Sequence, residues 1–371
     1  MTVLMMNIQA CVEVCFRDTH LMPGSLRTLR MIIFLGMGLI LSDVGAQRAT
    51  DIKGYGGQMS SSEAEALELR FESEPNDEML RLQLYGFYSR NHEEDSAVDR
   101  RLEHGLWLIE HSPRSGAHRH VYSAFNQKKH PDQFESGRRL WLAHAERNKE
   151  DLAIAEFSGL YLRKSDPNIA ALLFQRGVDA EPEEPRWPSH LGQTRTFAMD
   201  KAAAGSDEKQ EVAAEALEFF ERSYQLSTES GGGGMLTSLC RASIHCRNYD
   251  KARRYARRML AHEGGGDFDY ETKHFHGHTV LGVVALESRD FEQAREHLMQ
   301  SIQLPESARK LMYEPDMSLV RRLLSEGDKV VVREFFEACK PVWKDGQAQL
   351  REWQGKWDQG EAIVFERQQL Y

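Results

Sequence analysis

Two stretches of the sequence decide the fold: LTSLCRASIHCRNYDKARRYARRM, residues 236–259, and HTVLGVVALESRDFEQAREHLMQS, residues 278–301. In each stretch, apolar residues recur at helical spacing in two runs that a short polar break separates. The first run holds a small residue directly after a leucine, Cys240 in one stretch and Gly282 in the other. A small side chain there lets two helix backbones approach closely. Each stretch therefore predicts a pair of helices packed together as a hairpin.

The same pattern extends over most of the chain. Seven segments align on a small residue, an apolar or aromatic residue four positions later and a small residue three further on. These frames are Val98/Leu102/Gly105, Gly137/Trp141/His144, Ala170/Phe174/Gly177, Ala216/Phe220/Ser223, Ala252/Ala256/Met259, Ala294/Leu298/Ser301 and Val332/Phe336/Cys339. The helix before each frame has its predicted crossing position at Gly86, Phe125, Ser158, Gly192, Cys240, Gly282 or Val320. Successive frames begin 39, 33, 46, 36, 42 and 38 residues apart, which fits a unit of about 34 residues with insertions. Strand signals are almost absent after Ser60, so the sequence predicts an all-α array of helical hairpins.

This arrangement resembles a tetratricopeptide-repeat (TPR) solenoid. Three further stretches, GLWLIEH (105–111), GHTVLG (277–282) and PDMSL (315–319), are similar to a group of secreted bacterial TPR proteins without an assigned activity. The likeness covers most of residues 65–360 and departs from the repeat pattern in the first two frames, where Val98 and His144 replace small residues. It implies a right-handed TPR-like solenoid over residues 63–345. The mean frame spacing of 39 residues keeps a HEAT-like α-solenoid as the alternative.

Residues 346–371 are predicted to form a C-terminal capping helix and tail. A repeat array needs caps because each hairpin buries its apolar face only against a neighbour. Trp353 and Trp357 are four positions apart, and Trp343 lies ten positions before Trp353, so the three rings can share one helix face. That face is expected to cover the last repeat, with an exposed aromatic binding stripe as the alternative.

The N-terminus has the pattern of an export signal. Arg27 and Arg30 precede an eleven-residue apolar run, 31–41, and Val44 and Ala46 place small residues where a signal peptidase cleaves. As a helix the run would span about 16 Å of the roughly 30 Å hydrocarbon core. We therefore expect a signal peptide over residues 1–46, with Met22 as an alternative start, followed by a flexible linker over 47–62. An uncleaved anchor and a buried core helix are the other interpretations. The protein is expected in the periplasm or cell envelope, with membrane contact only through this signal.

Composition limits the class of partner. The chain has 371 residues, 47 Lys and Arg against 57 Asp and Glu, and a net charge of −10, which argues against nucleic acid as a partner. Of five cysteines, Cys240, Cys246 and Cys339 follow the export signal. Because their number is odd and their spacing wide, no disulfide framework is expected. All three are expected to be buried free thiols.

Only one group of residues suggests metal chemistry. His274 and His278 are four positions apart on a predicted helix, with Glu271 one turn earlier, but position 276 points to the other side and no H-E-x-x-H motif is present. The glycine runs at 231–234 and 264–266 lack a following Lys-Ser or Lys-Thr and are expected to be loops. No nucleophile or acid/base pair has a catalytic context. We expect no enzyme activity, catalytic residue, metal or cofactor.

The resemblance implies a binding role. TPR proteins bind a protein or peptide in the concave groove that their first helices line, and the polar residues expected there are Arg186, Gln193, Arg241, His245, His276, Thr279 and Glu287. The Lys and Asn of a carboxylate clamp are missing, although Arg241 could contact a carboxylate. The arginines at 253–258 offer an alternative patch for an acidic partner or anionic lipid. We therefore expect an exported interaction scaffold. The alternatives are a metal-dependent enzyme centred on His274, His276 and His278, and a self-associating structural component of the envelope.

Overall fold

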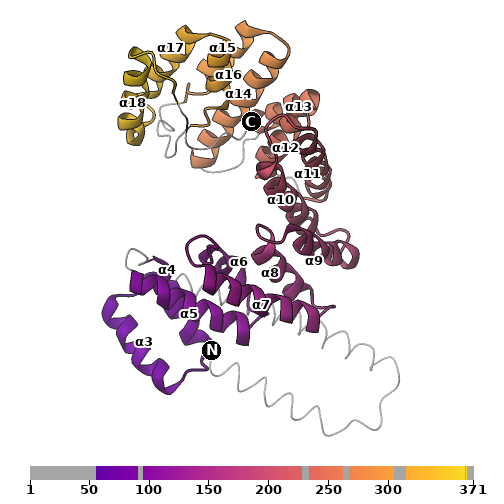
Figure 1. Cartoon of the computed structure of the whole chain (residues 1–371), viewed down its shortest axis with the longest axis vertical. Coiled ribbons are helices and arrows are strands. Elements are labelled where there is room, and N and C mark those ends of the chain that lie inside the picture. The colour runs from indigo at the N-terminus through magenta and orange to yellow at the C-terminus, as the bar shows by residue number, and fades with distance from the viewer. Residues whose placement is uncertain are drawn as a thin grey trace, which may run out of the picture. The chain divides into compact units, whose positions relative to one another are not determined.

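The computed structural model describes residues 56–90, 95–227, 234–261, 267–304, 315–363 and 365 (Figure 1). Within these ranges the chain forms helices joined by turns and loops, without a β-strand, so the predicted all-α class is confirmed. The expected signal peptide, most of the linker and the two glycine runs up to residues 233 and 266 lie outside the described residues. None of the described helices combines the length and the apolar character needed to cross a bilayer.

The chain divides into two compact units, residues 1–147 and 148–371. The helices of unit 1 are α3 (Ser61–Ser73), α4 (Glu78–Arg90), α5 (Asp95–His111), α6 (His118–Val121), η1 (Tyr122–Ala124) and α7 (Pro131–Arg147). Helix α4 contacts both α3 and α5, and α5 also packs on α7. The buried side chains of α4, among them Leu80, Leu84 and Tyr85, form the centre of this unit.

The helical part of the chain begins before residue 63, where the sequence predicts its start. The hydroxyl of Ser60 accepts from the backbone N–H of Glu63, and the Ser60 backbone N–H donates to the Glu63 carboxylate at 2.8 Å, which fixes the start of α3. Gly56 is buried against α4, where a Cβ atom on it would lie 2.2 Å from the carbonyl oxygen of Gln83. The linker expected over 47–62 is therefore wrong at its C-terminal end, where residues 56–62 pack on α4 or start α3.

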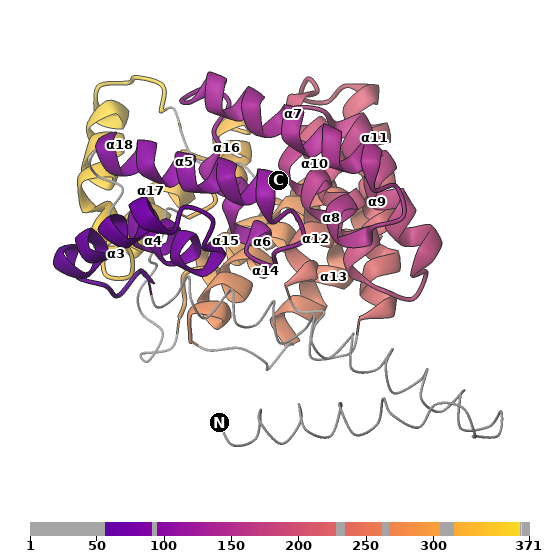
Figure 2. The same ribbon diagram turned by 90° about the horizontal axis from the view of Figure 1, so that it is seen from below.

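Unit 2 is a series of helical hairpins. Its helices are α8 (Leu152–Leu162), α9 (Pro167–Ala180), α10 (Arg186–Lys201), α11 (Asp207–Leu226), α12 (Met235–His245), α13 (Tyr249–Ala261), α14 (Asp267–Glu287), α15 (Phe291–Gln300), α16 (Ser318–Ser325), α17 (Lys329–Cys339), η3 (Lys344–Gly346) and α18 (Gln347–Asp358). From α8 to α15 each helix packs on the next along the chain. Later in the unit, α14 also contacts α12 and α16, and α15 contacts α17. The helices from α11 to α18 contribute side chains to one hydrophobic core, and Figures 1 and 2 show the helices of this unit as ribbons.

Glycines mark the close helix crossings. A Cβ atom on Gly192 of α10 would lie 2.7 Å from the Phe220 ring of α11, which is the crossing predicted for the frame that contains Phe220. In α8 the residue at the crossing is Gly159, one position after the predicted Ser158. A Cβ atom on Gly159 would lie 2.5 Å from the Phe174 ring. The small residues thus leave room for an aromatic ring of the facing helix.

The aromatic C-terminus packs on the last hairpin. The Trp353 ring of α18 is 1% exposed and lies 5.7 Å from Phe336 of α17 and 5.9 Å from Trp343, measured between ring centroids. Trp343 precedes η3 rather than lying on the same helix as Trp353. Since Trp343 and Trp353 are buried, these rings close the end of the core and do not form an exposed stripe.

The three described cysteines are free thiols. Cys240 of α12 and Cys339 of α17 are fully buried in one hydrophobic core, and burial raises the pKa of both thiols well above its usual value. Cys246 is partly exposed, and burial raises its pKa as well. The expected burial is therefore confirmed for Cys240 and Cys339.

Candidate functional site

Two of the expected groove residues lie between α8 and α10. Arg186, at the start of α10, pairs with Glu181 at 2.9 Å and reaches within 3.8 Å of Glu156 in α8. Gln193, two turns later on α10, accepts a hydrogen bond of 2.7 Å from the guanidinium of Arg163, which follows α8. Both residues therefore contact side chains in or directly after α8.

Glu156 is a functional candidate that the sequence analysis missed. Its side chain is buried, and its carboxylate lies 3.8 Å from Arg186 and 3.7 Å from His190. A buried carboxylate is costly unless cationic or hydrogen-bonding groups surround it. The signal was available, because Glu156 is the one charged residue in the apolar stretch LAIAEFSGLYL of α8.

Two further predicted residues join alternate helices by ion pairs. Arg241 of α12 pairs with Asp200 of α10, and Glu287 of α14 pairs with Arg322 of α16. Burial, together with a hydrogen bond to Glu287, raises the pKa of Tyr249 to about 12. Arg241 keeps about a fifth of its side chain exposed and Asp200 about two fifths, so a partner can reach this pair.

The remaining predicted residues are less accessible. The prediction that Thr279 projects into a groove is wrong. Thr279 is buried, and its hydroxyl donates to the carbonyl oxygen of Phe275 at 2.9 Å. That hydroxyl satisfies its own helix and does not project into a groove. His276 is half-buried, and burial lowers its pKa while the nearby Asp316 acts in the opposite direction. His245, the last residue of α12, is half-buried.

The histidines considered for a metal contact the next helix instead. His274 and His278 do share a face, with ring centroids 4.7 Å apart. The Nε2 atom of His274 lies 2.9 Å from the carbonyl oxygen of Gln300, and Nδ1 of His278 lies 3.2 Å from Nδ1 of His297. Burial and the two neighbouring imidazoles lower the pKa of His278 to about 4. Among the described side chains, which do not include Glu271, no three metal-ligating residues come together.

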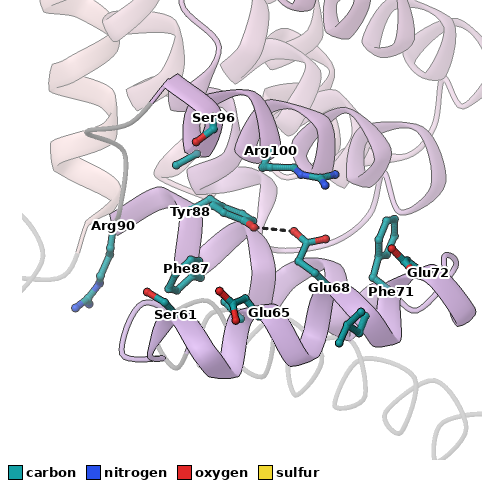
Figure 3. Close-up of a pocket in the computed structure, with 13 residues that line it drawn as sticks. Ser61, Glu65, Glu68, Phe71, Glu72, Phe87, Tyr88, Arg90, Ser96 and Arg100 are labelled. Atoms are coloured by element: carbon teal, nitrogen blue, oxygen red, sulfur yellow. Dashed lines mark hydrogen bonds between the residues drawn. The ribbon is translucent and has the colours of Figure 1, made fainter.

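Unit 1 contains a groove that the sequence analysis did not anticipate. It has a volume of about 1020 Å³ and is bounded by α3, the end of α4 and the start of α5 (Figure 3). Its lining residues are Ser61, Ala64, Glu65, Glu68, Leu69, Phe71, Glu72, Phe87, Tyr88, Arg90, Ser96, Ala97 and Arg100. Because three of them are glutamates of α3, we call it the acidic groove.

A buried polar cluster supports this groove. The Tyr88 hydroxyl donates to Glu68 at 2.7 Å (Figure 3). The Nε2 atom of the fully buried His104 lies 3.7 Å from the same carboxylate. His104 and Tyr88 hold the pKa of Glu68 below its usual value against the opposing effect of burial. Arg81 lies behind His104, with its guanidinium 4.0 Å from the centre of the Phe71 ring. Glu68 is therefore fixed as a carboxylate on the α3 side of the groove.

The sequence matches no protein-family model and no curated protein.

Proposed function

We propose that the chain is an exported scaffold of TPR-like hairpins that binds a protein or peptide on one face of unit 2. That face, the first-helix surface, consists of α8, α10 and α12 with Glu156, Arg186, Gln193 and Arg241. The single observation that supports it is the run of polar contacts between alternate helices: Arg186 and Glu156 join α10 to α8, and Arg241 and Asp200 join α12 to α10.

The hairpin arrangement supports the TPR-like interpretation. In a solenoid of this kind, first helices line the inner face and contact one another, while second helices pack outside them. The contacts of α14 with α12 and α16 fit this rule, as does the contact of α15 with α17. We further propose that residues 1–46 direct export and are then removed, as the succession of arginines, apolar run and small residues suggests.

The chemistry of the surface favours an acidic segment or a C-terminal carboxylate as its ligand. The planar guanidinium of Arg241 can bind a carboxylate through two parallel hydrogen bonds. A ligand carboxylate would replace Asp200, which is exposed enough to leave the pair. Surface ion pairs contribute little, about 0–1 kcal/mol, so this exchange costs little.

The proposal can be tested with short acidic peptides that end in a free carboxylate. Binding to the mature protein should be measured by fluorescence anisotropy for wild type, Arg241→Ala with Gln193→Ala, and Arg257→Ala. Arg257 lies on the exposed side of α13 and is the matched control. We expect the double variant, and amidation of the peptide, each to abolish binding, while circular dichroism stays as in wild type. Equal binding by wild type and the double variant would refute the assignment of this surface.

A further inference from the structure

The acidic groove has an acidic wall and an apolar floor. Helix α3 supplies Glu65, Glu68 and Glu72 on one side, as Figure 3 shows. Ala64, Phe87 and Ala97 are buried lining residues. Because two of these three floor residues are alanines, the backbone of a ligand can approach closely. The groove therefore combines an apolar base with a charged rim, which is the composition of a protein docking site.

The rim carries negative charge that the described residues do not neutralise. Glu68 is engaged by Tyr88 and His104. Glu65 and Glu72 are exposed and make no hydrogen bond or ion pair within the described part of the chain. They lie seven positions apart on α3, which places them on the same face about 10 Å from one another at 1.5 Å per residue.

The arginines of the groove do not cancel this charge. Arg100 donates to Glu103 at 3.2 Å, and Glu68 and Glu103 both raise its pKa. Arg90, the last residue of α4, packs beside Gly57 and makes no ion pair within the described part of the chain. The unpaired charge of the lining is thus that of two carboxylates and one arginine, which leaves it negative.

An exposed apolar side chain lies between the two carboxylates. Leu69 is 69% exposed, and it is among the few large apolar side chains that the described surface leaves open. It follows Glu65 by four positions and precedes Glu72 by three. This is the spacing of one helix face, so α3 presents the row acidic, apolar, acidic to a ligand that lies alongside it.

The spacing of the two carboxylates suits a helical ligand. Glu65 and Glu72 are separated by about two helical turns. A ligand helix parallel to α3 can therefore place one residue opposite each carboxylate, since both helices have the same repeat.

We propose that the acidic groove binds an amphipathic helix of a partner protein, in which two basic residues seven positions apart flank an apolar residue. The basic residues pair with Glu65 and Glu72, and the apolar residue covers Leu69 and reaches Phe87. This site lies in unit 1 and selects positive charge, so it goes beyond the function proposed for unit 2 and stands or falls separately.

The test uses the mature protein and a synthetic, fluorescently labelled helical peptide. The peptide has about 18 residues, because shorter isolated helices are marginal in water, and carries two lysines seven positions apart with a leucine between them. We expect Glu65→Lys with Glu72→Lys to weaken binding at least about tenfold. Leu69→Ala should weaken binding about five- to tenfold, because the substitution removes three of the four side-chain carbons and the ligand would cover about half of their area. A peptide with glutamates in place of the lysines should not bind.

The chain offers a matched control for charge reversal. Glu211 and Glu218 are exposed, lie seven positions apart on α11 of unit 2, and can be changed to Lys together. This variant should bind the peptide as wild type does and fold equally well by circular dichroism. Unchanged binding by the α3 variant, equal loss in the α11 variant, or preference for the glutamate peptide would each overturn the proposal. A dimer in light scattering that the α3 variant dissociates would also overturn it, because a second copy would then occupy the groove.

Discussion

Replacing Gly177 by Ala should destabilise unit 2, although alanine is the better helix former. A Cβ atom on Gly177 would lie 2.1 Å from the ring of Trp187, whereas carbon atoms at optimal contact are about 3.5–4.0 Å apart. The ring would have to move by more than about 1 Å, yet it is fully buried and its Nε1 donates to Glu181 at 2.8 Å. Overpacking costs about 1–3 kcal/mol and the helix gains about 1 kcal/mol from alanine. With the hydrogen bond also disturbed, we expect a net loss of about 2 kcal/mol.

Gly355 provides the control of opposite sign. It lies inside α18, and no atom lies within 4 Å of the position that a Cβ would take, so Gly355→Ala should stabilise the same unit by about 0.5–1 kcal/mol. In thermal unfolding followed by circular dichroism, 1 kcal/mol corresponds to about 2–4 °C for a unit of this size. The midpoint should therefore fall by about 4–8 °C for Gly177→Ala and rise slightly for Gly355→Ala. A rise for both variants would refute the crossing described for Gly177.

Three further outcomes are expected. Ala294→Leu should cost about 1–3 kcal/mol by urea denaturation because Ala294 is fully buried, while Arg257→Leu should stay within about 0.5 kcal/mol; equal shifts would contradict the repeat frame. Burial lowers the pKa of His118 to about 4, so as the pH falls below the ordinary histidine pKa of about 6.5 the unfolded chain binds the proton first. Unfolding of wild type should therefore become easier between about pH 6.5 and 4 by up to about 3 kcal/mol, and a His118→Gln variant should lack this part of the slope. Protein recovered from the envelope should begin at or near Gln47 by N-terminal sequencing; an intact start at Met1 would exclude cleavage.

The helices and several of their crossings could be predicted because they depend on local pattern. Small residues at helical spacing located the contact of Gly192 with Phe220 without any knowledge of tertiary structure. The pattern did not predict the division of the chain after Arg147. It weakens over unit 1, where Val98 and His144 replace small residues, and a repeat frame drawn through that region gives no boundary.

The candidate sites were predicted less evenly than the helices. Arg241 is a charged residue on the mostly apolar helix α12, so a contact with a neighbouring helix could be inferred for it. The charges of α3 have no such signal, because Glu65 and Glu72 look like any solvated helix face in the sequence. They line a groove only because α3 and α5 both pack on α4, and that arrangement is a tertiary property.

The burial of Cys240 and Cys339 makes these thiols natural reporters of local opening. A fully buried, protonated thiol reacts with an alkylating reagent only when its surroundings open, so each labelling rate measures the free energy of opening at α12 or at α17. In the TPR-like array proposed above, that free energy would be set largely by the nearest neighbours. Loosening the C-terminal cap should therefore speed labelling of Cys339 more than that of Cys240. The ratio of the two rates would report how far cooperativity travels along the chain.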